Sequence, residues 1–294
     1  MGISIGNSPE SWGITSLSEL NQTAWNRCLD EIAEAGYSCL ELGPYGYFPT
    51  DNVILERELS QRNLDISAGT LLATLEDNDS WPDIEKEAMR TGELLSSVGA
   101  KFFIVVDGFY RFQTGKQLGP PALDKYKWDT LIDNSHKLGD LVKSKFGLQL
   151  AFHPCADTHI EYQEQILEFL SDTDPGLVTL CLDTGHHAYR FGDPVAFMRE
   201  HHERIGYLHL KSVDFVIRKK VNQDELAFMD AVKLGVMCEP EQGVVDFMGF
   251  GRVLHEIKYE GYAIVEQDIY KPNLDVPFPI AKRTREYLRN IGIG

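Results

Sequence analysis

Eight short apolar segments, each followed by a stretch with helical spacing, constrain the fold of this chain more than any other feature. The apolar segments are Ile3–Asn7, Ser38–Leu42, Leu64–Thr70, Lys101–Asp107, Leu148–His153, Leu177–Asp183, Ile205–Lys211 and Tyr262–Asp268. Many are nearly continuous apolar runs, which is typical of strands buried on both faces of a parallel sheet. Eight such βα units in 294 residues predict an α/β fold, a (β/α)8 TIM barrel formed by residues 1–294 as a single domain.

The segments between these strands carry apolar residues at helical spacing. Helices are predicted at Trp25–Ala35, Asn52–Arg62, Trp81–Val98, Lys125–Lys145, Tyr162–Leu170, Pro194–His202, Phe247–Lys258 and Pro279–Ile291. A doubly wound open sheet is the alternative, but no Gly-rich phosphate loop follows the first strand. The connection 212–248 is unusually long, and connections of that length are more often functional than not.

Composition narrows the classes of function. The 28 basic and 45 acidic residues give a formal net charge of −17, so nucleic acid is not an expected partner. No run of about 18 apolar residues suggests a membrane span, and no N-terminal signal pattern is present. The cysteines form no CxxC pair, which favours reduced thiols. We therefore expect a cytoplasmic protein whose partner is a small molecule.

The strand ends are the candidate site, because catalytic residues of TIM barrels lie at the C-terminal ends of the strands. In the segment LCLDTGH (180–186), the apolar run stops at Asp183 and His186 follows in the next loop. Asp183, His209 and Glu266 end or nearly end the sixth, seventh and eighth predicted strands. Each of them alone could be a hydrogen-bonded strand end. Two carboxylates and an imidazole that converge on one point, however, would repel or titrate unfavourably unless a cation lies between them.

The donor types indicate which ion such a site would take. Mixed oxygen and nitrogen ligands suit Mn²⁺, Co²⁺, Mg²⁺ or Zn²⁺. A fourth protein ligand is expected from the fifth strand or from the loop that follows it. His153 and Glu161 are the two candidates.

Five segments in a fixed order carry a resemblance to a known family. They are AFHPCADTHIE (151–161), LCLDTGH, YLHLKSVD (207–214), FMDAVKLGVMCEPEQGVVDF (228–247) and GYAIVEQD (261–268). Together they resemble the xylose-isomerase-like (endonuclease IV-type) TIM barrels, and within that superfamily the inosose (2-keto-myo-inositol) dehydratase branch. The N-terminal segments SPESWGI and LELGPYGYFPTD are similar to that branch as well.

The resemblance implies roles for individual residues. It implies a divalent metal held by Asp183, His209 and Glu266, with Glu161 as the fourth ligand because it lies eight residues after His153. His153 is then expected to contact the substrate or to transfer a proton.

Further residues are expected near the substrate. The resemblance implies that His186 and Lys211 approach it and that Glu41 contacts a hydroxyl or the shell of the metal. The Trp12 side chain is a candidate apolar wall, with plain core packing as the alternative.

The chain departs from the branch in two places that bear on the substrate. His153-Pro154-Cys155 replaces the usual His-x-His, and Glu241-Gln242-Gly243 replaces a Gly-acid-Gly turn. Both leave the identity of the substrate open.

The implied function is a metal-dependent lyase or isomerase that acts on a keto-cyclitol or keto-sugar through an enediolate, most like inosose dehydratase of inositol catabolism. One Mn²⁺ or Co²⁺ is preferred, with Mg²⁺ or Zn²⁺ open. His153 or His186 would be the general acid or base, and Lys211 would polarise the substrate. A homo-oligomer is compatible with the resemblance.

Three alternatives remain open on the sequence. They are a sugar isomerase or epimerase of the same fold, a lyase that cleaves a keto-glycoside by β-elimination, and a non-catalytic sugar-binding barrel. An abasic-site endonuclease shares the fold, but it needs a basic face that a chain of charge −17 does not suggest.

Overall fold

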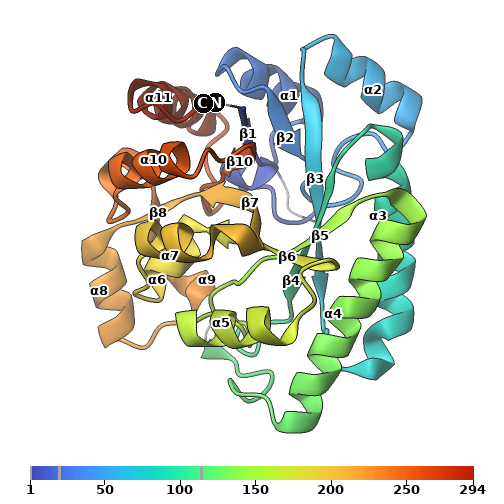
Figure 1. Cartoon of the computed structure of the whole chain (residues 1–294). Helices are drawn as coiled ribbons and strands as arrows, with labels where there is room; N and C mark the ends of the chain where they lie inside the picture. Colours follow the sequence, from blue (N-terminus) through green and yellow to red (C-terminus); the bar gives the residue numbers. More distant parts are fainter. Residues whose placement is uncertain (1, 19–20, 113–114) are drawn as a thin grey trace.

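The computed structural model describes residues 2–18, 21–112 and 115–294. Within these residues, eight parallel strands close into a barrel in the order β1, β10, β7, β6, β5, β4, β3, β2 (Figure 1). Their bounds are β1 Ile3–Asn7, β2 Cys39–Glu41, β3 Asp65–Ala73, β4 Phe102–Asp107, β5 Gln149–Phe152, β6 Val178–Asp183, β7 Ile205–Leu210 and β10 Gly261–Val265. The predicted TIM barrel is confirmed, and each of these strands overlaps a predicted one.

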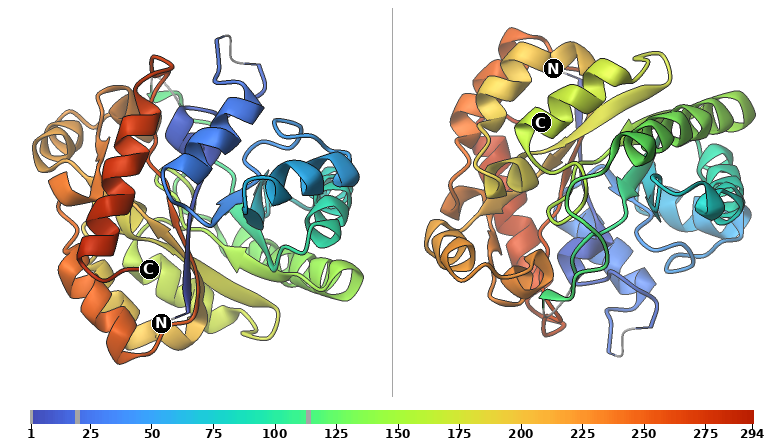
Figure 2. Two further views of the ribbon diagram at one scale, coloured as in Figure 1. Left: turned by 90° about the horizontal axis from the view of Figure 1, so that it is seen from above. Right: turned by 90° about the horizontal axis from the view of Figure 1, so that it is seen from below.

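Helices surround the barrel on its outer side, as Figure 1 and the views from above and below in Figure 2 show. The α-helices are α1 Trp25–Glu34, α2 Asn52–Ser60, α3 Trp81–Ser97, α4 Lys125–Phe146, α5 Gln163–Asp172, α6 Thr184–Tyr189, α7 Pro194–His201, α8 Phe215–Gln223, α9 Phe228–Lys233, α10 Phe247–Glu256 and α11 Pro277–Asn290. Short 3-10 helices are η1 Pro9–Trp12, η2 Asn78–Ser80, η4 His202–Arg204 and η5 Pro240–Gln242.

Local sequence signals explain where several of these helices begin and end. The Asp51 and Asp124 carboxylates each accept a backbone N–H from the first turn of the helix that follows, α2 and α4 respectively. Helix α4 ends at Gly147, whose φ of 69° lies in the left-handed region that glycine adopts without strain.

The apolar core has two layers. The larger layer lies between the sheet and the helices, and the smaller one fills the barrel itself. The inner layer takes one side chain from each of seven strands: Cys39, Ala68, Ile104, Ala151, Cys181, Tyr207 and Ile264. Strand β1 contributes Gly6, where an added Cβ would lie 2.5 Å from Cδ1 of Ile264. The barrel is therefore a packed core, and a ligand must bind above this layer.

Two details differ from the sequence prediction, and a third concerns a segment whose structure the sequence left open. Strand β10 ends at Val265, so Glu266 and Asp268 belong to the segment after it. His186 lies in the short helix α6 rather than in a loop. The connection 212–248 is also folded, with α8, α9 and an antiparallel pair of β8 (Ser212–Val213) and β9 (Met237–Cys238).

Figures 1 and 2 show both termini close together, with β1 and α11 leading to them. No helix in the described ranges is long and apolar enough to cross a bilayer.

Candidate metal centre

Four side chains converge directly above the inner layer of the barrel. His153, Asp183, His209 and Glu266 each follow an inner-layer residue by two positions in the sequence. Since side chains alternate along a strand, this spacing directs all four toward the barrel axis. One ligand atom from each lies within 4.8 Å of the others. We refer to these four residues as the metal cluster.

The contacts inside the metal cluster are close. Nε2 of His153 is 3.4 Å from Oδ2 of Asp183, and Nδ1 of His209 is 3.6 Å from the same oxygen. Nδ1 of His209 is also 2.6 Å from Oε2 of Glu266. Strand pairing fixes part of this arrangement, because Asp183 and His209 are register partners in β6 and β7.

Asp183 has two roles, and they explain why an apolar strand ends in this carboxylate. Its Oδ1 accepts the backbone N–H groups of Gly185 and His186 at 2.7 and 2.8 Å, which caps helix α6. Its Oδ2 points into the metal cluster. One carboxylate therefore starts the helix that carries His186 and supplies an oxygen to the cluster.

Glu41 orients His209 from the opposite side of the ring. Nε2 of His209 donates to Oε1 of Glu41 at 2.7 Å, which leaves Nδ1 directed at the metal cluster. A carboxylate behind an imidazole is the arrangement that usually fixes a metal-ligating histidine. Burial alone would lower the pKa of His209, but Cys181, Glu41 and Glu266 raise it well above the ordinary value.

Lys211 lies beside the metal cluster and is completely buried. Its Nζ is 3.2 Å from Oδ2 of Asp183, 3.3 Å from Oε1 of Glu266 and 3.0 Å from Oδ2 of Asp268. Burial opposes the charge, but the Asp183, Asp268 and Glu266 carboxylates raise the pKa of Lys211 well above its usual range. The ammonium group is thus held by carboxylates, and the residue does not line the cavity described below.

The balance of charge shows that the donor set fits a divalent cation. Among the described residues that meet here, four carboxylates (Glu41, Asp183, Glu266, Asp268) face one ammonium group, which leaves −3 when both ligand histidines are neutral, as a bound cation requires, and −2 when His209 is protonated. Within the same part of the chain, Oδ2 of Asp183 and Nδ1 of His209 are buried and make no well-directed hydrogen bond. Buried atoms of this kind are costly unless something binds them. Two imidazoles and two carboxylates are ligands that Zn²⁺, Mn²⁺ and Co²⁺ accept.

His186 is placed to hold a proton next to the metal cluster. Its Nδ1 accepts the backbone N–H of Ala156 at 3.1 Å, so the neutral ring carries its hydrogen on Nε2. Nε2 lies 3.8 Å from Sγ of Cys155 and 4.0 Å from Oδ2 of Asp268. Burial and the Lys211 ammonium group lower the pKa of His186 well below its ordinary value, which keeps the ring neutral.

A cavity of about 440 Å³ opens above these residues. Its polar lining includes Glu10, Glu41, His153, His186, His209, Glu266 and Asp268. The cavity thus gives a small molecule access to three members of the metal cluster and to the imidazole of His186.

Comparison with known proteins places the chain in a family. The profile of the family described as "Xylose isomerase-like TIM barrel" matches residues 29–291. The chain belongs to the xylose isomerase-like TIM barrel family. The chain is 31% identical to an inosose dehydratase from Geobacillus thermodenitrificans. The match covers 98% of this chain and 96% of the inosose dehydratase. The resemblance noted in the sequence is therefore confirmed.

Solved structures share the fold at lower identity. A D-allulose 3-epimerase from Methylomonas sp., solved in complex with D-allulose, superposes with a TM-score of 0.74 at 16% identity and covers 98% of this chain and 97% of its own. The IOLI protein, solved with a zinc atom, has a TM-score of 0.72 at 16% identity and covers 99% of this chain and 98% of its own. At 16% identity, the similarity to these two structures shows only that the chain has the same fold.

The structure does not place Glu161, the expected fourth ligand, in the metal cluster. Its Oε1 accepts the Tyr110 hydroxyl at 2.8 Å, and its Oε2 accepts Nε of Arg190 at 2.6 Å and the backbone N–H of Asp157 at 2.7 Å. His153 takes the fourth position instead, because it continues the alternation of β5 whereas Glu161 lies in the loop beyond.

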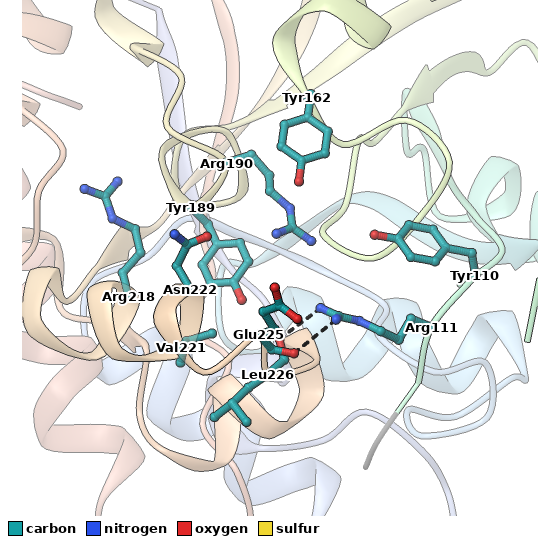
Figure 3. A pocket seen from close by; sticks show the side chains of 10 residues that line it. All are labelled: Tyr110, Arg111, Tyr162, Tyr189, Arg190, Arg218, Val221, Asn222, Glu225 and Leu226. Carbon is teal, nitrogen blue, oxygen red and sulfur yellow. Dashed lines mark hydrogen bonds between the residues drawn. The ribbon is translucent and has the colours of Figure 1, made fainter. Parts of the chain in front are cut away.

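Glu161 belongs to a second group of charges, which we call the arginine cluster: the buried Asp157 and Glu161 and the partly buried Arg111 and Arg190. Asp157 accepts Nη2 of Arg111 at 3.0 Å and Nη2 of Arg190 at 2.8 Å. Arg190 and Arg111 line a separate pocket of about 390 Å³ between α6, α8 and the loop after β4, and Figure 3 shows both side chains there. Arg111 also donates to the carbonyl groups of Glu225 and Leu226, so the cluster ties the segment between α8 and α9 to the barrel.

Trp12 was expected near the substrate, but its indole belongs to the core. The side chain is fully buried, and its Nε1 donates to Oε2 of Glu31 in α1 at 2.6 Å. The neighbouring Glu10, which the sequence reasoning missed, lines the cavity in its place. Burial raises the pKa of Glu10 to about 8, with smaller contributions from the Glu266 and Glu41 carboxylates.

Asp268 is the second cavity residue that the sequence reasoning missed. It follows Glu266 by two positions, and that spacing is the signal that could have identified it. Burial and the Glu266 carboxylate raise its pKa, although Lys211 opposes the shift.

Proposed function

We propose that this protein is a divalent-metal-dependent lyase or isomerase acting on a keto-cyclitol or keto-sugar, most like inosose dehydratase. The observation that carries the proposal is the metal cluster on the floor of a cavity, where two imidazoles and two carboxylates each offer one ligand atom within 4.8 Å of the others. The 31% identity to an inosose dehydratase over nearly the whole chain supports this class of substrate.

His153, Asp183, His209 and Glu266 would hold the ion, and Glu41 would fix the ring of His209 through Nε2. When bound, a divalent cation supplies Lewis-acid polarisation of a carbonyl group. Lys211 is then a positioning residue, because its ammonium group holds Asp183, Glu266 and Asp268 in place and does not reach the cavity. This assignment replaces the substrate contact expected from the sequence.

Proton transfer is assigned to His186 and Asp268. The hydrogen on Nε2 of His186 faces the cavity, with Oδ2 of Asp268 at 4.0 Å. The Asp268 carboxylate can take the proton from the carbon beside the carbonyl group and pass it to the hydroxyl group that leaves, which departs as water, while the neutral His186 ring donates a hydrogen bond from Nε2 to that oxygen. His153, expected from the sequence as a possible acid or base, has its Nε2 directed at Asp183 and is assigned to the ion.

The test is turnover of 2-keto-myo-inositol by protein loaded with Mn²⁺, Co²⁺, Zn²⁺ or Mg²⁺ in turn. Dehydration predicts an ultraviolet-absorbing dione that forms only with metal present. Exchange of the α-hydrogen with deuterated water without dione formation would favour an epimerase or isomerase at the same site. Absence of both reactions with every ion would contradict the proposal.

A further inference from the structure

The cavity above the metal cluster has two chemically different sides. The polar side carries the cluster, His186 and Asp268, and beside them lie the apolar side chains of Phe228, Met229 and Val232 from α9. The opposite side is built from β3, β4 and the loop after β4, and apart from Thr70 its lining is apolar: Leu72, Ile104, Val106, Phe109 and Phe112. We call these five residues the apolar wall.

The apolar wall continues to the mouth of the cavity. Leu72 is 57% exposed and Phe112 is 40% exposed, although both side chains are large and apolar. Leu72 and Val106 are register partners in β3 and β4, so the sheet itself sets their spacing. Exposed apolar groups that continue a ligand cavity usually mark a surface that a ligand covers.

Backbone hydrogen bonds hold the outer part of the apolar wall in place. The N–H of Tyr110 donates to the carbonyl of Asp157 at 2.9 Å, and the N–H of Leu118 donates to the carbonyl of Tyr110 at 2.7 Å. The Phe109 and Phe112 rings lie with their centroids 6.1 Å apart. The wall is thus a built surface on a loop that is anchored to the segment after β5.

A free cyclitol or monosaccharide bound at the metal cluster would leave the apolar wall uncovered. Such a ring carries a hydroxyl group on nearly every carbon, and a hydroxyl against Leu72 or Phe112 would lose its hydrogen bonds to water without replacement. The cavity volume of about 440 Å³ also falls in the range of roughly 300–1,000 Å³ that holds drug-sized ligands, which are larger than a single sugar ring.

We propose that the substrate is a keto-sugar that bears an aromatic substituent, with the sugar ring at the metal cluster and the aromatic group against the apolar wall. Aromatic rings pack well against Phe and Leu side chains, and they need no hydrogen bonds there. This inference rests on the proposed function, since the metal cluster fixes which end of the ligand is the sugar.

The test compares two glycosides that differ only in the substituent and cannot react because they lack a keto group: phenyl and methyl β-D-glucoside, with the β-D-galactoside pair alongside. Affinity is measured by calorimetry on the full chain saturated with metal. In at least one of the two pairs, the phenyl glycoside is expected to bind at least about tenfold more tightly than the methyl glycoside, because it buries more apolar surface. Phe112→Ala and Leu72→Ser should each reduce that ratio toward one.

Leu118→Ser is the matched control. Leu118 is 56% exposed, close to the value for Leu72, and it lies on the same loop as Phe112 but outside the cavity lining. It should leave the phenyl-to-methyl ratio unchanged. A ratio near one in the unaltered protein, or a high ratio that both wall variants retain, would overturn the inference.

The outcomes separate this inference from the proposed function. Turnover of 2-keto-myo-inositol together with equal binding of phenyl and methyl glycosides would overturn the aromatic substituent alone. A high ratio that depends on the apolar wall, in a protein without turnover of any keto-sugar, would support the binding site and contradict the proposed reaction.

Discussion

The metal cluster and the arginine cluster are both groups of buried or partly buried charges on the same face of the barrel, but they differ in how completely their charges and hydrogen bonds are satisfied. In the arginine cluster, two guanidinium groups face two carboxylates, and all four carboxylate oxygens accept hydrogen bonds. Around the metal cluster, four carboxylates face one ammonium group, and two buried ligand atoms lack well-directed hydrogen bonds among the described residues.

This difference indicates which cluster serves stability and which serves chemistry. A neutral, fully hydrogen-bonded group of ions needs nothing further and can hold loops together. An excess of negative charge in a buried site costs free energy unless a cation or a substrate compensates it. Paired changes in the two clusters test this division.

The largest effect is expected from Glu266→Gln in the metal cluster. The amide keeps the shape of the side chain but removes a charged ligand. Turnover of the keto-sugar should fall by about 10⁴-fold, or roughly 5 kcal/mol in activation free energy, if the ion provides most of the catalysis. Steady-state kinetics at saturating metal measure the loss. Turnover within tenfold of the unaltered enzyme would show that this carboxylate is not essential.

Arg190→Met in the arginine cluster should instead lower stability. It removes the partner of Glu161 and one partner of Asp157, both of which are buried. We expect the free energy of unfolding to fall by about 3 kcal/mol, while metal binding remains. Urea unfolding measures the change. Arg199→Met is the control, because Arg199 and Glu256 form an exposed pair at 3.6 Å whose loss should cost less than about 1 kcal/mol. Equal losses in the two variants would contradict a structural role for the arginine cluster.

Metal removal should destabilise the protein by an intermediate amount. At an ion concentration of about 100 times Kd, binding to the folded state alone adds about 2.7 kcal/mol. Thermal unfolding with and without a chelator measures this gain. Glu161→Gln should retain the metal-dependent rise in Tm and Glu266→Gln should lose it. The reverse pattern would exchange the roles of the two clusters.

A smaller effect is expected from His187, which follows His186 in α6 but packs against Phe197, away from the cavity. Burial lowers its pKa from 6.5 to about 4. The unfolded chain therefore binds this proton more readily, and stability falls as the pH drops from about 6.5 toward 4. At pH 5 the loss should be about 2 kcal/mol. Urea unfolding of the metal-free protein at pH 7 and pH 5 should show this slope, and His187→Gln should lack it. An equal slope in the variant would assign the pH dependence to other groups.

The barrel and most of the metal cluster could be predicted because they follow from local patterns. Apolar runs define strands, and strand ends in a TIM barrel lie on one face. Asp183, His209 and Glu266 were identified in this way, and the structure brings all three together.

Deciding between His153 and Glu161 requires knowing which residues of each strand point toward the barrel axis. His153 follows the inner-layer residue Ala151 by two positions, which directs it toward the axis, whereas Glu161 lies in the loop that contacts Arg190. The same phase places Asp107 on the outer side, where it contacts His159 at 2.9 Å. The burial of Lys211 could not be foreseen, because it depends on three carboxylates from two separate segments.

The most direct test of this account is the metal content of His153→Gln and Glu161→Gln after identical loading and desalting. Mass spectrometry of the unaltered protein and of Glu161→Gln should give about one ion per chain, since a site needs its ligands rather than its neighbours. His153→Gln should retain much less. If Glu161→Gln loses the ion while His153→Gln keeps it, the assignment of the two clusters is contradicted.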